Sequence, residues 1–121
     1  MTKLSIVIPF YNEEENIDYI LKNIDKEYKN FSEFILVDNG STDNTLKKID
    51  DYINLNNTKK IIKIKIEKNI GYGNGINTGL KIANGDFLGW THGDLQTDIK
   101  DIYKGFEMIE NGKYNNYIFL K

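Results

Sequence analysis

The chain has 121 residues, with 16 basic and 18 acidic side chains and a formal net charge of −2. This length suits one domain, and the mixed charge excludes the broad positive surface that nucleic-acid binding needs. The absence of cysteine excludes disulfides and thiolate metal sites. We find no signal peptide and no apolar run near the roughly 20 residues that cross a bilayer. We therefore expect a cytoplasmic protein, with peripheral membrane contact left open.

Apolar runs and amphipathic helices alternate in the first half of the chain. Residues 4–10 (LSIVIPF) and 34–37 (FILV) are continuous apolar runs, typical of strands buried on both faces. Apolar side chains recur at helical spacing at positions 17, 20, 21 and 24, and again at 46, 49 and 53. The first helix is expected to be capped by Asn12 with Glu15, and the second by Ser41 or Asp43.

The second half continues this alternation. Isoleucine at 62, 64 and 66 alternates with charged side chains, which predicts a strand at the sheet edge. The glycine-rich residues 69–79 lead into a short helix with Gly85 as its C′ residue. Residues 87–90 predict a fourth strand, and Asp98 is expected to cap a helix over about 99–109. An extended segment at 117–120 is a candidate for pairing with a second copy in a homodimer.

Strands alternating with helices predict a Rossmann-like, three-layer α/β/α fold with a mainly parallel sheet. We expect residues 1–121 to form a single domain. Ligands of such sheets bind at the carboxyl ends of the strands. Four polar segments occupy that rim in this sequence: PFYNE, DNGSTD, NIGYG and THGDLQTD.

The four segments together predict a nucleotide-like ligand, although each also has a purely structural interpretation as turns and caps. Tyr11 offers a ring for stacking on a base, and Asp38 or Asn39 offers hydrogen-bond acceptors. The glycine-rich segment fails the dinucleotide-binding spacing, because Ile76 and Thr78 stand where glycine is required. It remains either a helix entry that receives phosphate through free amides or a loop that needs positive φ values.

The segment THGDLQTD holds the candidate metal ligands. Asp94 is ionised at neutral pH and is the kind of oxygen donor that Mg²⁺ prefers. His92 is the only histidine. As a ligand it would shift the preference toward Mn²⁺, and otherwise it is a structural hydrogen-bonding residue.

In order and spacing, SIVIPFYNEEENI, ILVDNGSTDNT and NIGYGNGINTGLKIANGDFLGWTHGDLQTD resemble the N-terminal half of the inverting family 2 glycosyltransferases, which have the GT-A fold. The resemblance runs from Leu4 to about Ile109. The sequence DLQ at 94–96 is similar to the branch with dolichol-phosphate mannose synthases and bacterial polyprenyl-phosphate sugar transferases. The resemblance implies Mg²⁺- or Mn²⁺-dependent transfer of a sugar from a nucleotide-sugar donor to a polyprenyl phosphate or a glycan.

The resemblance also assigns residues to the nucleotide and the metal. The matching positions are Pro9, Tyr11 and Glu13 in the first nucleotide-binding loop, Asp38 and Asn39 at the base and ribose, Asn69, Gly71 and Gly73 near the nucleotide, and Asp94 at the metal and diphosphate. This sequence departs from the pattern where Asn39 replaces an acid and His92 replaces the first aspartate of the D-x-D motif.

Two other functions stay open at this point. Because the resemblance covers only the donor-binding half and identifies no general base, the chain is alternatively a non-catalytic nucleotide or nucleotide-sugar binding module. A phosphoacceptor receiver domain has similar length and architecture. That class requires an aspartate at the end of the third strand, where this sequence has Lys68 and Asn69.

Overall fold

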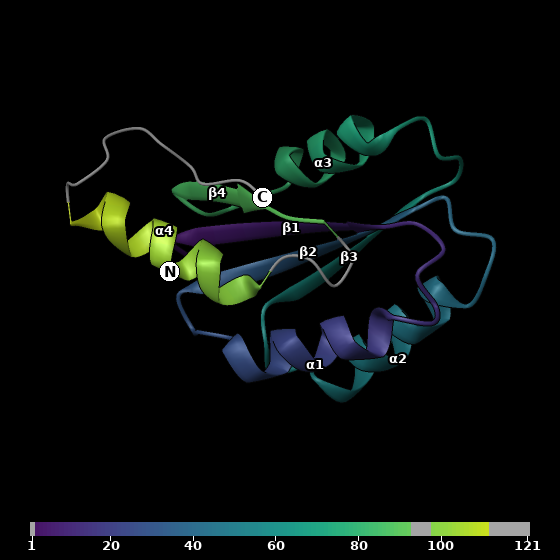
Figure 1. Ribbon diagram of the computed structural model, residues 1–121, viewed down its shortest axis with the longest axis horizontal. Helices are drawn as coiled ribbons and strands as arrows, with labels where there is room; N and C mark the ends of the chain where they lie inside the picture. Colours follow the sequence, from purple (N-terminus) through teal and green to yellow (C-terminus); the bar gives the residue numbers. More distant parts are fainter. Residues whose placement is uncertain (1, 93–97, 112–121) are drawn as a thin grey trace.

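The computed structural model describes residues 2–92 and 98–111 of the chain (Figure 1). Its elements are β1 (Leu4–Phe10), α1 (Ile17–Glu27), β2 (Ser32–Asn39), α2 (Thr45–Leu55), β3 (Ile61–Ile66), α3 (Tyr72–Lys81), β4 (Phe87–Trp90) and α4 (Ile99–Glu110). The four strands form one parallel sheet in the order β3-β2-β1-β4. The predicted α/β class with a mainly parallel sheet is confirmed.

Helices cover both faces of the sheet, which gives the three predicted layers. In Figure 1, α3 lies on one side of the sheet, and α1 and α2 lie on the other. The side of β1 that carries Ile6, Ile8 and Phe10 packs in one core with residues of α1, α2 and α4. The opposite side, which carries Val7, packs in a second core with Ile76 of α3. This two-sided packing follows from the alternation of side chains along a strand.

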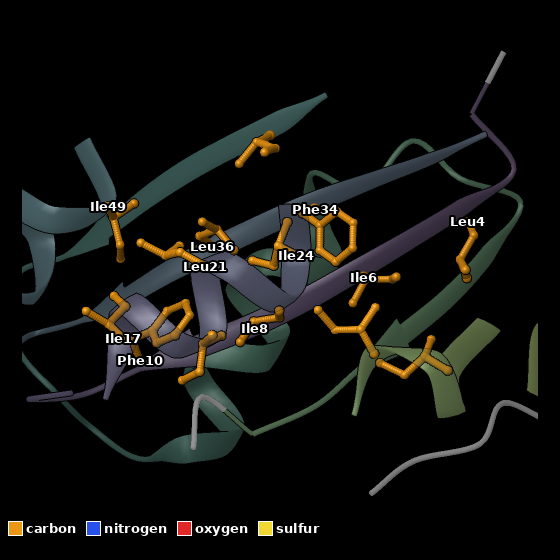
Figure 2. Close-up of a cluster of buried hydrophobic side chains, with 14 of the residues drawn as sticks. Leu4, Ile6, Ile8, Phe10, Ile17, Leu21, Ile24, Phe34, Leu36 and Ile49 are labelled. Atoms are coloured by element: carbon orange, nitrogen blue, oxygen red, sulfur yellow. The ribbon is translucent and has the colours of Figure 1, made fainter. Parts of the chain in front are cut away.

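The larger core centres on β1. Every residue of β1 and β2 is buried, as their continuous apolar runs predict. Figure 2 shows Ile8 and Phe10 of β1 close to Ile17 of α1. A fully buried side chain of this size stabilises the fold by about 1.5–3 kcal/mol. This burial holds the sheet against the helices, and the ends of the strands are thereby held in place.

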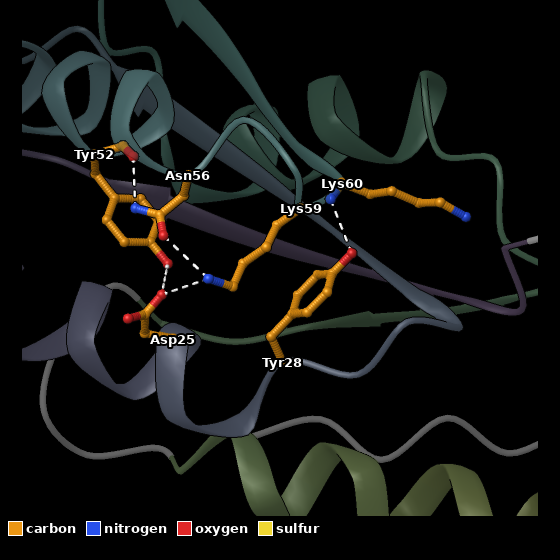
Figure 3. Close-up of polar contacts among 6 residues, drawn as sticks. All are labelled: Asp25, Tyr28, Tyr52, Asn56, Lys59 and Lys60. Atoms are coloured by element: carbon orange, nitrogen blue, oxygen red, sulfur yellow. Dashed lines mark hydrogen bonds and ion pairs between the residues drawn. The ribbon is translucent and has the colours of Figure 1, made fainter.

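β3 is an edge strand, as its alternating pattern predicts. Its exposed Lys63 forms an ion pair with Asp50 of α2, with 2.6 Å between Nζ and Oδ1. At the start of β3, the Asp25 carboxylate accepts hydrogen bonds from Tyr52 at 3.1 Å and from Lys59 at 2.9 Å (Figure 3). These contacts join α1, α2 and the turn that precedes the edge strand.

The predicted N-caps of the first two helices are wrong. The N-cap position is Asn16 for α1 and Asn44 for α2, rather than Asn12 and Ser41 or Asp43, and neither side chain makes a capping hydrogen bond. Asp43, one residue earlier, still bonds the first amide of α2, because its Oδ1 accepts from the Thr45 amide at 3.0 Å. The Asn12 side chain is engaged by Thr42 on another loop, a partner that local sequence does not reveal. For the last helix the prediction is confirmed, because Asp98 caps α4 and accepts from the Lys100 amide.

The predicted C′ residue of α3 is also wrong. The helix ends at Lys81 with Ile82 as its C-cap, before Gly85. The Gly85 amide instead donates to the Ser5 hydroxyl at 2.8 Å. A Cβ at position 85 would lie 2.7 Å from the Ser5 backbone nitrogen, so glycine is needed there for a close approach to β1 and not for a helix end.

Two expectations concern membranes and self-association. No helix within residues 2–92 and 98–111 combines the length and apolar character of a membrane span. The segment 117–120, expected to be extended and proposed for homodimer pairing, lies outside the described residues.

A methyl group added at two glycines of α3 should have opposite effects on the stability of the fold. A Cβ at Gly79 would lie 2.5 Å and 3.1 Å from the two methyl carbons of Val7, so Gly79→Ala should destabilise the fold by about 1–3 kcal/mol through overpacking. Gly73→Ala is the matched control, because its Cβ meets nothing within 4 Å and should stabilise the helix by about 0.5–1 kcal/mol. Urea unfolding of both variants measures this, and equal effects would contradict the close packing of α3.

Candidate functional site

A pocket of about 300 Å³ opens at the carboxyl end of the sheet. It lies beside the end of β1, where β2 and β4 flank the central strand on opposite sides, the position at which ligands bind such sheets. The pocket is lined by Pro9, Phe10, Tyr11, Glu13, Asn39, Asn69, Tyr72 and His92. Six of these eight are predicted site residues. Phe10 and Tyr72 lie within the predicted rim segments PFYNE and NIGYG but were not singled out as ligand contacts.

Aromatic rings form much of the pocket wall. Tyr11 follows β1 directly and remains 48% exposed, so its ring is accessible to a ligand. On the side of α3, the Tyr72 and His92 rings stack with 4.7 Å between centroids and 19° between planes. This stack joins the start of α3 to the end of β4. An aromatic residue between Gly71 and Gly73 in a polar loop was the sequence signal for Tyr72.

Asn39 provides the buried polar group of the pocket. Its side chain is 3% exposed, and its Nδ2 donates to the Gly71 carbonyl at 3.2 Å. Its Oδ1 is buried and has no hydrogen-bond partner in the described part of the chain. A buried acceptor without a partner is destabilising, so this oxygen suits a donor group supplied by a ligand.

Asp38 lies on the other side of the sheet. Neighbouring residues of a strand face opposite ways, which places Asp38 on the side of Phe34 and Leu36, where α1 and α2 pack. Burial raises the pKa of the Asp38 carboxyl, although hydrogen bonds from Ser41 oppose this shift. The structure therefore separates the predicted base-binding pair, with Asn39 in the pocket wall and Asp38 beneath the loop that follows β2.

The glycine-rich loop shapes the entrance to α3. Gly71 has a φ of 121°, in the region that favours glycine, and its amide donates to Asn69 Oδ1 at 2.8 Å. Gly73 lies inside the first turn of α3, which begins at Tyr72 in the pocket wall. The loop thus has the positive φ value that one of the two interpretations requires. The other interpretation, in which the free amides of the helix receive phosphate, stays a prediction.

The candidate metal ligands are only partly described. His92 is exposed in the pocket wall, whereas Asp94 lies outside the described residues. Within residues 2–92 and 98–111, no group of three or more His, Cys, Asp or Glu side chains is placed to hold a metal ion. Thr91, which the sequence analysis also missed, is 2% exposed, and its hydroxyl has no hydrogen-bond partner in this part of the chain.

The family model described as "Glycosyl transferase family 2" matches residues 5–120 of the chain. The chain belongs to this family. It is 34% identical over 115 residues to an undecaprenyl-phosphate 4-deoxy-4-formamido-L-arabinose transferase of Proteus mirabilis. The match covers 93% of this chain and 35% of that protein. The chain thus spans about a third of the length of this curated relative.

Two solved structures resemble the fold. S. aureus TarS 1-349 in complex with UDP-GlcNAc superposes with a TM-score of 0.76 and 27% identity, over 91% of this chain and 32% of TarS. The mannosyltransferase PcManGT from Pyrobaculum calidifontis, in complex with GDP-Man and Mn²⁺, gives a TM-score of 0.71 and 26% identity, over 76% and 27%. These likenesses confirm the GT-A fold that the sequence resemblance implied.

The buried carboxylate of Asp38 predicts a pH-dependent change in stability. Its raised pKa means that folding favours the neutral acid, so the ionised form destabilises the fold at pH 7. Asp38→Asn should therefore raise the free energy of unfolding at pH 7. The gain should shrink as the pH falls through the folded pKa of Asp38, because the unsubstituted side chain then becomes neutral as well.

Urea unfolding at pH 7 and near pH 4 measures this difference. Asp51→Asn is the control, because this exposed carboxylate pairs with Lys47 one turn away on α2 and its loss should change stability by less than about 1 kcal/mol. A loss of stability in Asp38→Asn that is the same at both pH values would contradict the burial of an unfavourable charge.

Proposed function

We propose that this chain binds a nucleotide-sugar donor in the pocket at the carboxyl end of the sheet, as the donor-binding part of an inverting glycosyltransferase. The observation that carries this proposal is the pocket itself. The pocket wall includes the accessible ring of Tyr11, the first residue of α3, and Asn39, whose buried Oδ1 has no partner among the described residues. A base, a diphosphate and the polar edge of the base can use these groups in turn. The similar structures of TarS in complex with UDP-GlcNAc and of PcManGT in complex with GDP-Man support it.

Each residue predicted to bind the nucleotide has a proposed role. Tyr11 stacks on the base, and Asn39 Oδ1 accepts a hydrogen bond from the base or ribose. The loop at Gly71 and Gly73 gives phosphate oxygens access to the first amides of α3. Pro9, Glu13 and Asn69 complete the wall around the nucleotide. Asp38 is not among the lining residues; its proposed role is to accept hydrogen bonds from Ser41 and so hold the loop after β2 beside the base and ribose.

We further propose Mg²⁺ or Mn²⁺ as cofactor, held by His92 and Asp94. The described residues fit this proposal in one respect, since the exposed imidazole of His92 is a metal donor in the pocket wall. When bound, the cation would offset negative charge on the departing nucleoside diphosphate. The Mn²⁺ in the PcManGT complex supports a divalent cation.

The proposed acceptor is a polyprenyl phosphate or a glycan. The name of the Proteus mirabilis relative supports the polyprenyl phosphate. A phosphate acceptor carries an ionised oxygen nucleophile and so needs no general base. Such an acceptor fits a cytoplasmic protein that works at the membrane face. We propose residues 1–121 as one nucleotide-sugar-binding domain.

A second candidate function is a nucleotide-sugar binding module without catalysis. Asn39 and His92 favour it, because both replace acids of the family pattern. Asn39 keeps an acceptor for the base or ribose but not the charge, and His92 removes one negative charge from the metal site. Hydrolysis or transfer of a radiolabelled donor by this chain separates the two functions: turnover supports the transferase, and binding without turnover supports the module.

Removing the Tyr11 ring should weaken nucleotide binding. Tyr11→Ala should reduce affinity for UDP or GDP about tenfold, because stacking of a base on an aromatic ring contributes about 1–3 kcal/mol. Tyr19→Ala is the matched control, since Tyr19 lies on α1, is 64% exposed and is not among the pocket-lining residues. Isothermal titration calorimetry measures both, and equal affinities would remove Tyr11 from the site.

The metal proposal predicts how binding depends on cations. Asp94→Ala should abolish the difference in nucleoside diphosphate affinity between Mn²⁺ and chelator, and His92→Asp should strengthen Mg²⁺-supported binding by adding an oxygen donor. Calorimetry with Mg²⁺, Mn²⁺ and EDTA measures these effects. An unsubstituted chain that binds equally well in EDTA would contradict the role of the cation.

A further inference from the structure

The loops that follow β1 and β2 are joined by a set of hydrogen bonds that we call the clasp. It comprises the contacts of residues 12–14 with residues 41–45. The first loop has no helical or strand structure between Phe10 and Ile17. Its second part is held by a turn in which the Asn16 and Ile17 amides donate to the Glu13 carbonyl, and its first part is held by the clasp. The clasp lies next to Tyr11, and its residue Glu13 also lines the pocket.

Asn12 makes one half of the clasp. Its backbone has a φ of 51°, a left-handed conformation that asparagine adopts more easily than most residues. Its Oδ1 accepts from the Thr42 amide at 2.8 Å, and its own amide donates to the Ser41 hydroxyl at 3.0 Å. The side chain thus bonds the second loop, and the backbone turns sharply between Tyr11 and Glu13.

Thr45 and Asp43 make the other half. The fully buried Thr45 accepts from the Glu13 amide at 2.8 Å and donates to Asp43 Oδ1 at 2.6 Å. Asp43 Oδ1 also accepts from the Thr45 amide at 3.0 Å, and Oδ2 accepts from the Glu14 amide at 3.3 Å. Consecutive amides of the first loop are therefore held by side chains of the second.

We propose that Asn12, Asp43 and Thr45 are positioning residues that hold Tyr11 and Glu13 in their binding geometry before the nucleotide arrives. The inference rests on the proposed function of the pocket and adds residues that do not line it. A loop that must be ordered during binding reduces affinity, whereas a loop ordered in advance does not. The clasp thus sets nucleotide affinity through the position of Tyr11.

Two substitutions at Thr45 separate positioning from general stability. Thr45→Val keeps the shape of the side chain but removes the acceptor for the Glu13 amide, and Thr45→Ser keeps that acceptor. With UDP or GDP and Mn²⁺ in calorimetry, Thr45→Val should weaken affinity at least about fivefold, while Thr45→Ser should stay within about twofold. Both are measured at a temperature where circular dichroism shows each variant folded. Hydrogen exchange at the Glu13 amide is a second measurement. It should be faster in Thr45→Val than in the unsubstituted chain and unchanged in Thr45→Ser.

Asn12→Gly tests the clasp independently, including the case in which Thr45→Val does not fold. Glycine accepts the φ of 51°, so the variant removes the contact with Thr42 without backbone strain and should also bind at least about fivefold more weakly. Asn57→Gly is the matched control, because Asn57 is exposed in the turn after α2 and should not change affinity.

The outcomes distinguish the clasp from the proposed function. Folded Thr45→Val and Asn12→Gly variants that bind as tightly as the unsubstituted chain overturn the positioning role and leave nucleotide binding intact. An unsubstituted chain that binds neither UDP nor GDP overturns the proposed function, and the positioning role falls with it. Weak binding in both variants, with normal binding in Thr45→Ser, supports the clasp.

Discussion

The structure depends on the burial of β1 between two parallel neighbours. All seven residues of this strand are buried, and it pairs in register with β2, where Phe10 meets Asp38, and with β4, where Val7 meets Trp90. Parallel pairing places the carboxyl ends of these strands at the same edge of the sheet. β2 lies on one side of β1 and β4 lies on the other. The loops that follow these strands therefore diverge at the carboxyl end of β1 and leave the pocket between them.

The two ends of the sheet differ in whether their buried polar side chains are hydrogen-bonded. At the amino end, the Glu33 carboxylate, 2% exposed, accepts from the Ser5 hydroxyl at 2.5 Å and from the Asn84 amide at 2.6 Å. At the carboxyl end, one side-chain oxygen of each of three buried residues has no partner within residues 2–92 and 98–111: Asp38, Asn39 and Thr91. The left-handed Asn12 lies at the same end. Unfavourable features of this kind cluster at functional sites, so this asymmetry supports the proposal that the ligand binds at the carboxyl end.

Sequence patterns predicted the elements because each pattern reports local burial. The apolar run of β1, the alternation of isoleucine and lysine in β3 and the cap at Asp98 are all confirmed by the structure. The errors concern residues whose partners are distant in sequence: Asn12 bonds Thr42, 30 residues away, and Gly85 bonds Ser5, 80 residues away. The placement of Asp38 and Asn39 on opposite faces was available from strand periodicity, which puts neighbouring side chains on opposite sides.

The central claim is that a nucleoside diphosphate occupies the pocket beside β1. Two-dimensional amide NMR of the isotope-labelled chain, titrated with UDP or GDP in Mg²⁺, tests it most directly. The account predicts saturable shifts at the Tyr11, Asn39 and Tyr72 amides, all in the wall of this pocket. A second cavity of about 440 Å³ between α1 and α2 includes Lys22 and Tyr52. Shifts confined to that groove, or no saturable shift at either place, would contradict the account.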